Sequence, residues 1–91
     1  MIRVRCGENR MTLLGHAGYA ARGQDVVCAA ASALVYALIG TLRQKQQLRE
    51  LVIRPGYVTV AADGECEDSF AVVRCGLGQL AGAYPAYVAM E

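Results

Sequence analysis

The sequence has few of the residues on which many functional sites depend. Its 91 residues include no tryptophan, one phenylalanine and a single histidine, His16. Its four cysteines lack the close CxxC spacing of zinc sites, so we expect no metal and no other cofactor. Charge of one sign is also lacking, because nine basic and eight acidic residues leave a formal net charge of +1. This balance argues against direct binding of nucleic acid or of an anionic membrane.

Long hydrophobic runs and targeting segments are also missing. The longest nearly apolar run, residues 26–40, is shorter than the ~20 residues of a membrane span. The opening residues, MIRVRCGENRM, have no apolar stretch followed by a small-residue cleavage site, so no secretory signal is expected. We therefore predict a cytoplasmic protein whose cysteines are free thiols. Cys6 and Cys75 fit predicted core positions, and Cys66 is predicted to be exposed.

The pattern of apolar residues predicts one α/β domain over residues 1–91. Alternation of apolar and polar residues predicts a strand at 2–6, and 11–16 is predicted as its returning hairpin partner. Two β-prone runs around Pro55-Gly56 predict strands at 48–54 and 57–62, and a short final strand is predicted at 86–90. A helix is predicted over 26–42, after Asp25, and its nearly continuous apolar residues indicate burial on several sides. A second helix follows the acidic residues 65–68 and stops at Pro85. The order ββαββαβ predicts a two-layer sandwich with both helices on a mixed or antiparallel sheet.

Two further features concern packing. Hydrophobic residues make up 55% of the chain, more than so small a protein can bury, so a second copy is expected to cover an apolar face. The glycines of residues 75–82, CGLGQLAG, fall inside the second predicted helix and not between a strand and a helix. They therefore do not form a dinucleotide-binding loop, and we interpret them as points of close helix packing.

Residues 15–32, GHAGYAARGQDVVCAAAS, carry the strongest indication of chemistry. His16 ends a predicted strand, and Cys28 begins the first predicted helix, where the positive end of the helix dipole favours a thiolate. A thiolate beside an imidazole is the minimum equipment for nucleophilic acyl transfer. In this hypothesis Cys28 attacks a carbonyl carbon and His16 accepts and returns the proton. Free amides at the helix start, including that of Cys28, are the expected oxyanion hole.

Each of these residues also has an ordinary structural explanation. A lone cysteine is commonly a small core residue, and a lone histidine commonly completes local hydrogen bonds. Asp25 is expected to cap the helix rather than to orient the histidine. Ser32, four residues beyond the cysteine, has two alternatives: a bond to substrate or histidine, or a bond back to its own helix. Gly18 and Gly23 indicate either a mobile loop or ordinary turns.

The same run resembles the signature of the ribosomal-processing cysteine protease (Prp) family. The matching segments are GHA at residues 15–17, GQD at 23–25 followed by two valines, and CAAAS at 28–32. The family's size is matched along the whole chain, including the Tyr84-Pro85 pair before the last predicted strand. The resemblance assigns to the substrate-binding loop or groove Gly15, Ala17, Gly18, Gly23, Asp25 and Ser32.

The resemblance implies a homodimeric endopeptidase with a Cys–His dyad. Cys28 would be the nucleophile, His16 the general base and acid, and residues 17–24 a loop that closes over the peptide. The implied substrate is the N-terminal extension of large-subunit ribosomal protein number twenty-seven, cut after a hydrophobic segment. Two alternatives remain. One is a non-enzymatic dimeric module on the ribosome, which would tolerate Cys28→Ser; the other is a redox-responsive protein, which needs a resolving thiol near Cys28.

Overall fold

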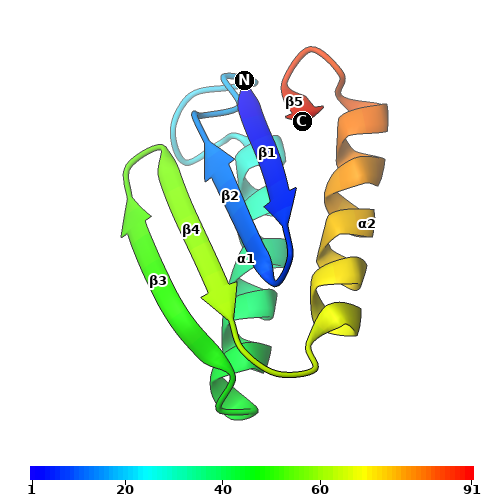
Figure 1. Ribbon diagram of the computed structural model, residues 1–91. Helices are drawn as coiled ribbons and strands as arrows, with labels where there is room; N and C mark the ends of the chain where they lie inside the picture. Colours follow the sequence, from blue (N-terminus) through cyan, green and yellow to red (C-terminus); the bar gives the residue numbers. More distant parts are fainter.

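The computed structural model describes all residues from 1 to 91 and shows a sheet covered on one face by two helices (Figure 1). The strands are β1 (Ile2–Gly7), β2 (Arg10–Leu14), β3 (Leu48–Arg54), β4 (Tyr57–Ala62) and β5 (Val88–Met90). The helices are α1 (Val26–Gln44) and α2 (Glu67–Ala83). The order ββαββαβ and the two-layer architecture confirm the prediction from the sequence.

The sheet is mixed, with the strand order β3-β4-β2-β1-β5. All neighbouring pairs are antiparallel except β1 and β5, which run parallel. In the β2–β4 ladder Leu14 pairs with Tyr57, so the end of β2 meets the beginning of β4. The loop that follows β2 therefore lies beside the turn that joins β3 to β4, although more than thirty residues separate them in the sequence.

The core lies between the sheet and the helices. Inward-facing residues of the strands, such as Val4, Met11 and Val60, are almost completely buried, and in β1 and β2 they alternate with polar residues that face outward. Leu42 of α1 and Leu77 of α2 have no exposed surface and complete this layer. Burial of a side chain of this size contributes about 1.5–3 kcal/mol, so this layer supplies most of the driving force for the fold.

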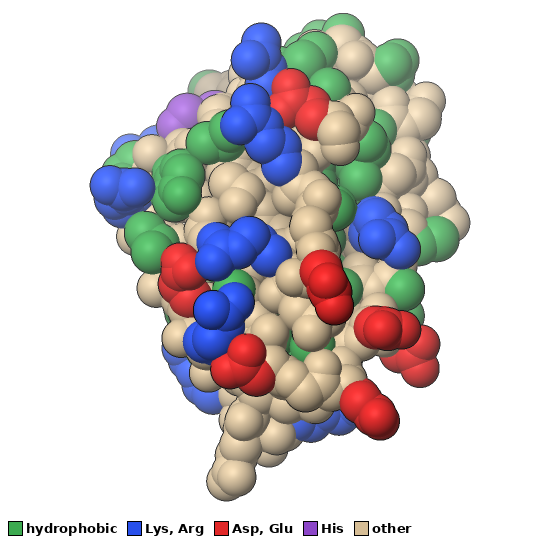
Figure 2. Space-filling model, viewed as in Figure 1, with side chains coloured by type: hydrophobic (Ala, Val, Ile, Leu, Met, Phe, Trp, Pro, Cys, Tyr) green, Lys and Arg blue, Asp and Glu red, His purple; other side chains and the backbone are tan.

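The other face of the sheet is open to solvent and carries charges of both signs (Figure 2). Arg5 pairs with Glu91, with an N–O distance of 2.7 Å, and Arg10 pairs with Glu50 at 2.8 Å. Ion pairs this exposed contribute at most about 1 kcal/mol each. The arginines of this face are thus largely balanced by carboxylates, which agrees with the small net charge.

Burial of α1 differs from the prediction. A single face is buried, formed by Val27, Ala31, Val35, Leu38, Ile39 and Leu42. On other sides of the helix Val26 and Tyr36 are 57% and 54% exposed. The expectation of burial on several sides is wrong for the single chain because, in a two-layer fold, the sheet and α2 cover only part of the helix surface.

The length of α1 also exceeds the predicted 26–42. Its 19 residues are long and apolar enough, by length and composition, to cross a membrane. The residues of its buried face pack in the core cluster with strands β1, β2 and β4. This arrangement is that of the central helix of a layered fold, and a core helix passes the same test of length and composition.

The predicted positions of three cysteines are wrong. Cys66 is buried, whereas Cys6 and Cys75 are exposed. Cys66 precedes the first residue of α2 as the chain turns into the core, and burial raises the pKa of its thiol. Cys75 lies two residues after the buried Val73, which on a helix points it away from the sheet. Cys6 lies near the end of β1, where partial burial raises its pKa.

Close helix packing is confirmed at one glycine of α2. A Cβ atom placed on Gly76 would lie 2.9 Å from Cδ2 of Leu34 on α1, so the absence of a side chain lets the two helices approach. Gly78 and Gly82 have open space around them. The packing interpretation therefore holds for Gly76 and not for the other two.

Candidate active site

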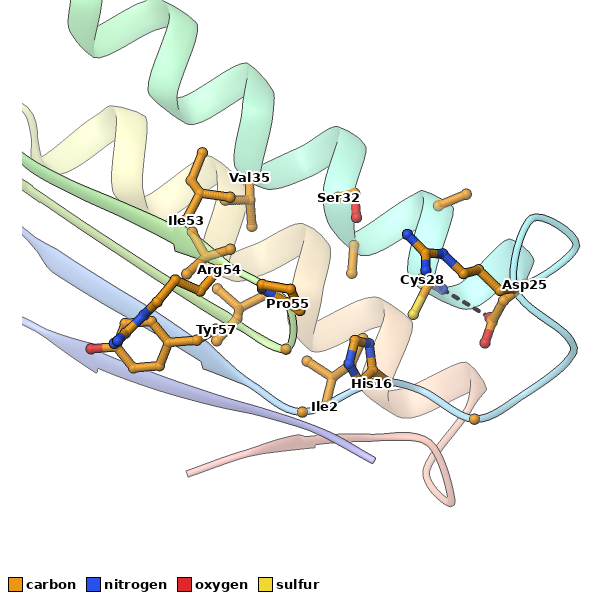
Figure 3. A pocket seen from close by; sticks show the side chains of 18 of the residues that line it. Ile2, His16, Asp25, Cys28, Ser32, Val35, Ile53, Arg54, Pro55 and Tyr57 are labelled. Carbon is orange, nitrogen blue, oxygen red and sulfur yellow. Dashed lines mark hydrogen bonds between the residues drawn. The ribbon is translucent and has the colours of Figure 1, made fainter.

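A groove of about 850 Å³ opens between α1, the loop after β2 and the β3–β4 turn (Figure 3). His16 lies on the loop side, Cys28 and Ser32 lie on α1, and Pro55 and Gly56 form the turn. The remaining lining is mainly apolar and includes Ile2, Leu13, Val35, Tyr36 and Ile53. The fold thus brings the histidine and the cysteine singled out in the sequence to the same groove.

His16 is positioned by the end of β2. The Gly15 amide donates a hydrogen bond to the Gly56 carbonyl oxygen at 2.8 Å, which joins the loop to the β3–β4 turn. Gly15 has φ +90°, and a Cβ atom there would overlap the carbonyl oxygen of Met1. The glycine of the GHA segment is therefore required by the backbone, because no larger residue fits between the two chain segments.

Cys28 is the third residue of α1. The Asp25 side chain caps this helix: its Oδ1 accepts hydrogen bonds from the amides of Val27 and Cys28, both at 3.0 Å. The expectation that Asp25 is a helix cap is confirmed. The expectation of a free Cys28 amide is wrong, because the carboxylate that caps the helix occupies that amide.

A different amide points at the sulfur. The buried Ala17 lies on the loop, and its N–H donates to Sγ of Cys28 at an N–S distance of 3.4 Å. This contact places partial positive charge beside the sulfur, as does the N-terminal turn of α1. Sequence reasoning did not identify this donor, because any residue type except proline carries a backbone amide.

Asp25 also holds the loop. Its Oδ2 accepts hydrogen bonds from the amides of Tyr19 at 3.0 Å and Ala20 at 3.4 Å. These four amide donors, led by that of Cys28, lower the pKa of Asp25. No hydrogen bond joins the Asp25 carboxylate to His16. Its observed role is to tie the loop to the start of α1.

Acid is therefore expected to loosen the loop. Because the pKa of Asp25 is lowered in the folded protein, its charged form stabilises the fold. This stabilisation is complete at pH values above the ordinary aspartate pKa of about 3.9, and it is lost as the pH falls through the lowered pKa. We expect the amide resonances of Tyr19 and Ala20 to shift below about pH 4 in an NMR titration. Asp25→Asn should remove this titration, since an amide carries no charge; persistence of the shift in that variant would contradict the assignment.

The loop has a second anchor in its aromatic residue. The Tyr19 ring packs edge-on against the rings of Tyr84 and Tyr87, with centroid distances of 5.4 and 5.2 Å. Both partners lie in the segment between α2 and β5. Edge-to-face pairs are favourable beyond the area they bury, so the C-terminal segment supports the loop.

Ser32 and the loop glycines Gly18 and Gly23 have few contacts with the rest of the chain. Ser32 is exposed, lines the groove on the Cys28 side, and its hydroxyl makes none of the hydrogen bonds in the structure. The hydroxyl therefore bonds neither to His16 nor back to its own helix, and a bond to substrate stays a prediction. Gly18 and Gly23 have φ +71° and +87° with open space around them, so both occupy turn conformations that favour glycine.

His16 and Cys28 face the same groove without a hydrogen bond between them (Figure 3). The histidine is exposed, and its imidazole lies against the β3–β4 turn. Catalytic contacts are often long in free enzymes and shorten when substrate binds. None of the other three cysteines lines the groove, so the redox-responsive alternative lacks a resolving thiol there.

A thiol in the first turn of a helix, an amide directed at its sulfur and one imidazole across an apolar groove are the components of a thiol hydrolase. A family model described as "Cysteine protease Prp" matches residues 1–89. The chain belongs to this cysteine protease family.

Individual relatives agree with this membership. The chain is 28% identical over 94 aligned positions to the ribosomal processing cysteine protease Prp of Mycoplasma pneumoniae, with 100% of the chain and 94% of that protein covered. Among solved structures, SMU.848 from Streptococcus mutans is 26% identical with a TM-score of 0.78, covering 100% and 92% of the two chains. The ribosomal processing protease Prp from S. aureus, with a covalently linked product peptide, has a TM-score of 0.85 at 16% identity and covers 99% and 95%. This last likeness shows the fold.

Proposed function

We propose that this cysteine protease acts in ribosome assembly, removing the N-terminal extension of large-subunit ribosomal protein number twenty-seven with Cys28 and His16 as its dyad. The proposal rests mainly on one observation: the side chains of His16 and Cys28 line the same groove, and the Ala17 N–H donates a hydrogen bond to the Cys28 sulfur. The names of the relatives support ribosomal processing, and the S. aureus relative holds a peptide covalently.

The proposed reaction has two halves. Cys28 Sγ attacks the scissile carbonyl carbon while His16 takes the thiol proton, and His16 then protonates the leaving amine as the C–N bond breaks. Water, activated by His16, hydrolyses the thioester and restores the thiol. The Ala17 N–H already points at the sulfur, so it is the donor best placed for the developing oxyanion. The Cys28 amide can contribute only if Asp25 releases it.

The groove favours an apolar, extended peptide. Its walls combine the apolar side chains of Ile2, Val35 and Ile53 with the exposed ring of Tyr36. A hydrophobic segment before the cleavage site would be removed from water along these walls. Residues 17–24, anchored by Asp25 and by Tyr19, form one rim of the groove and are the segment proposed to close over the substrate.

The same proposal includes a homodimer in the cytoplasm. Exposed apolar side chains also remain outside the groove, above all Val72 of α2, which is 70% exposed. Covering such residues with a second copy would remove apolar surface from water. A cytoplasmic location follows from the ribosomal substrate. Metal and cofactor have no part in this mechanism.

A cleavage assay with purified protein tests the substrate assignment. Ribosomal protein number twenty-seven with its N-terminal extension is incubated with the enzyme and read by mass spectrometry; the same protein without the extension is the control. We expect one cut after the hydrophobic segment, absent with His16→Ala. If the substrate stays intact while iodoacetamide modifies Cys28 ahead of the other cysteines, the thiol chemistry stands and the substrate is a different one.

A further inference from the structure

We propose that Gly56 is a positioning residue for His16: the Pro55-Gly56 turn supports the imidazole and sets its resting orientation in the groove. The inference rests on the proposed role of His16 in the dyad. In this inference the turn between β3 and β4 acts by holding the imidazole in place, since the turn itself contributes no reactive group.

Main-chain pairing brings the turn to the histidine. The β2–β4 ladder ends at the pair Leu14 and Tyr57. One step further, the Gly15 amide donates to the Gly56 carbonyl oxygen at 2.8 Å. The turn and the residue before His16 are therefore held in register by the same ladder that builds the sheet.

The contact itself is between the imidazole and the glycine. A Cβ atom placed on Gly56 would lie 3.0 Å from Nε2 of His16, 3.5 Å from Cδ2 and 3.7 Å from Cε1. A side chain at residue 56 would therefore press on the edge of the ring that carries Nε2, and the ring would have to give way. The Met1 ammonium donates a hydrogen bond to the His16 carbonyl oxygen at 2.6 Å, which fixes the backbone. The imidazole itself makes none of the side-chain hydrogen bonds in the structure and lies against the turn.

Support by packing suits a proton carrier. A ring that makes no hydrogen bond can turn away from Gly56 when substrate draws it toward Cys28, without breaking a bond to the protein. A wall of fixed backbone still limits where the ring rests. Displacement of a catalytic group by about 1 Å can cost 10²-fold in rate.

The conformation of Gly56 offers a competing explanation, because its φ of +70° alone favours glycine. Gly64 provides a matched control. It has φ +89° in the turn after β4, and a Cβ atom there would meet only the Gln47 side chain, at an ordinary 3.5 Å. Asparagine tolerates this backbone region, and Asn9 already occupies it in this chain with φ 52°.

The test therefore compares Gly56→Asn with Gly64→Asn. We expect Gly56→Asn to lower kcat/KM for peptide cleavage by about tenfold or more, mainly through kcat, and Gly64→Asn to stay within about twofold of wild type. The sequence contains one histidine, so the Hε1 resonance of His16 is unambiguous in the NMR spectrum. Its chemical shift should move in Gly56→Asn and not in Gly64→Asn.

A second measurement uses the wild-type protein, so its result does not depend on whether a variant folds. A nuclear Overhauser effect between the His16 ring protons and the Gly56 α-protons is expected, and its absence would overturn the inference. Equal activity and equal His16 resonances in the two variants would overturn it as well, even if His16→Ala is inactive and the dyad stands. If His16→Ala cleaves peptide as fast as wild type, the dyad assignment fails and the positioning role in catalysis falls with it, whatever the Overhauser effect shows.

Discussion

Cys28→Ala is expected to abolish peptide cleavage, lowering kcat by at least about 10⁴-fold. Removal of the attacking atom leaves only substrate binding and electrostatic stabilisation, and nucleophile deletions in other hydrolases have effects of this size or larger. The expected fold is unchanged, because Cys28 is only partly buried and alanine retains its Cβ. Steady-state kinetics with a peptide that spans the cleavage site, together with circular dichroism, measures both quantities.

The exposed cysteines are the matched controls for this variant. Cys6→Ala and Cys75→Ala remove thiols that do not line the groove, so each should retain wild-type kcat/KM. Cleavage by Cys28→Ala at more than about a hundredth of the wild-type rate would contradict the role of Cys28 as nucleophile. A loss of activity in the control variants would show that thiol removal in general, and not the groove thiol, is responsible.

Leu42→Ala is expected to have the largest effect on stability. Leu42 lies in the last turns of α1, has no exposed surface, and is remote from the groove lining. A buried leucine replaced by alanine costs about 2–5 kcal/mol, because the transfer term and the cavity add. For a domain of this size such a loss lowers the melting temperature by at least about 10 °C.

Gln44→Ala is the corresponding surface control, since Gln44 is exposed in the last turn of the same helix. Its free energy of unfolding should stay within about 0.5 kcal/mol of wild type when protein concentration is held constant. Urea unfolding followed by circular dichroism yields both values. A Leu42→Ala variant as stable as Gln44→Ala would show that the α1–sheet layer is not the main core.

Local sequence patterns predicted the elements and one end of the site. Local sequence patterns located all five strands to within two residues at each end, and the Asp25 cap located the start of α1. These predictions succeed because strand pleating, helix capping and the effect of Pro85 act over a few neighbouring residues. The short last strand begins at Val88, two residues later than predicted, because Tyr84 to Tyr87 form a turn after α2.

Predictions that depended on tertiary packing were less successful. Cys66 and Cys75 exchanged their expected environments, because periodicity alone does not show how far a helix face is covered. The apolar run of α1 predicted burial on several sides, yet Tyr36 remains exposed where the two layers end. The predicted oxyanion donor, the Cys28 amide, is occupied by Asp25, and the amide on the sulfur is that of Ala17.

The sequence by itself determined the order of elements, the family resemblance of residues 15–32, and the pair His16 and Cys28 as the residues to test. Only the tertiary structure decided what surrounds them: the Ala17 amide on the sulfur and the Gly56 turn beneath the imidazole. The physical reason is the pairing of β2 with β4. This ladder joins segments more than forty residues apart in the sequence, and backbone amides and glycines have no side-chain pattern from which such contacts could be predicted.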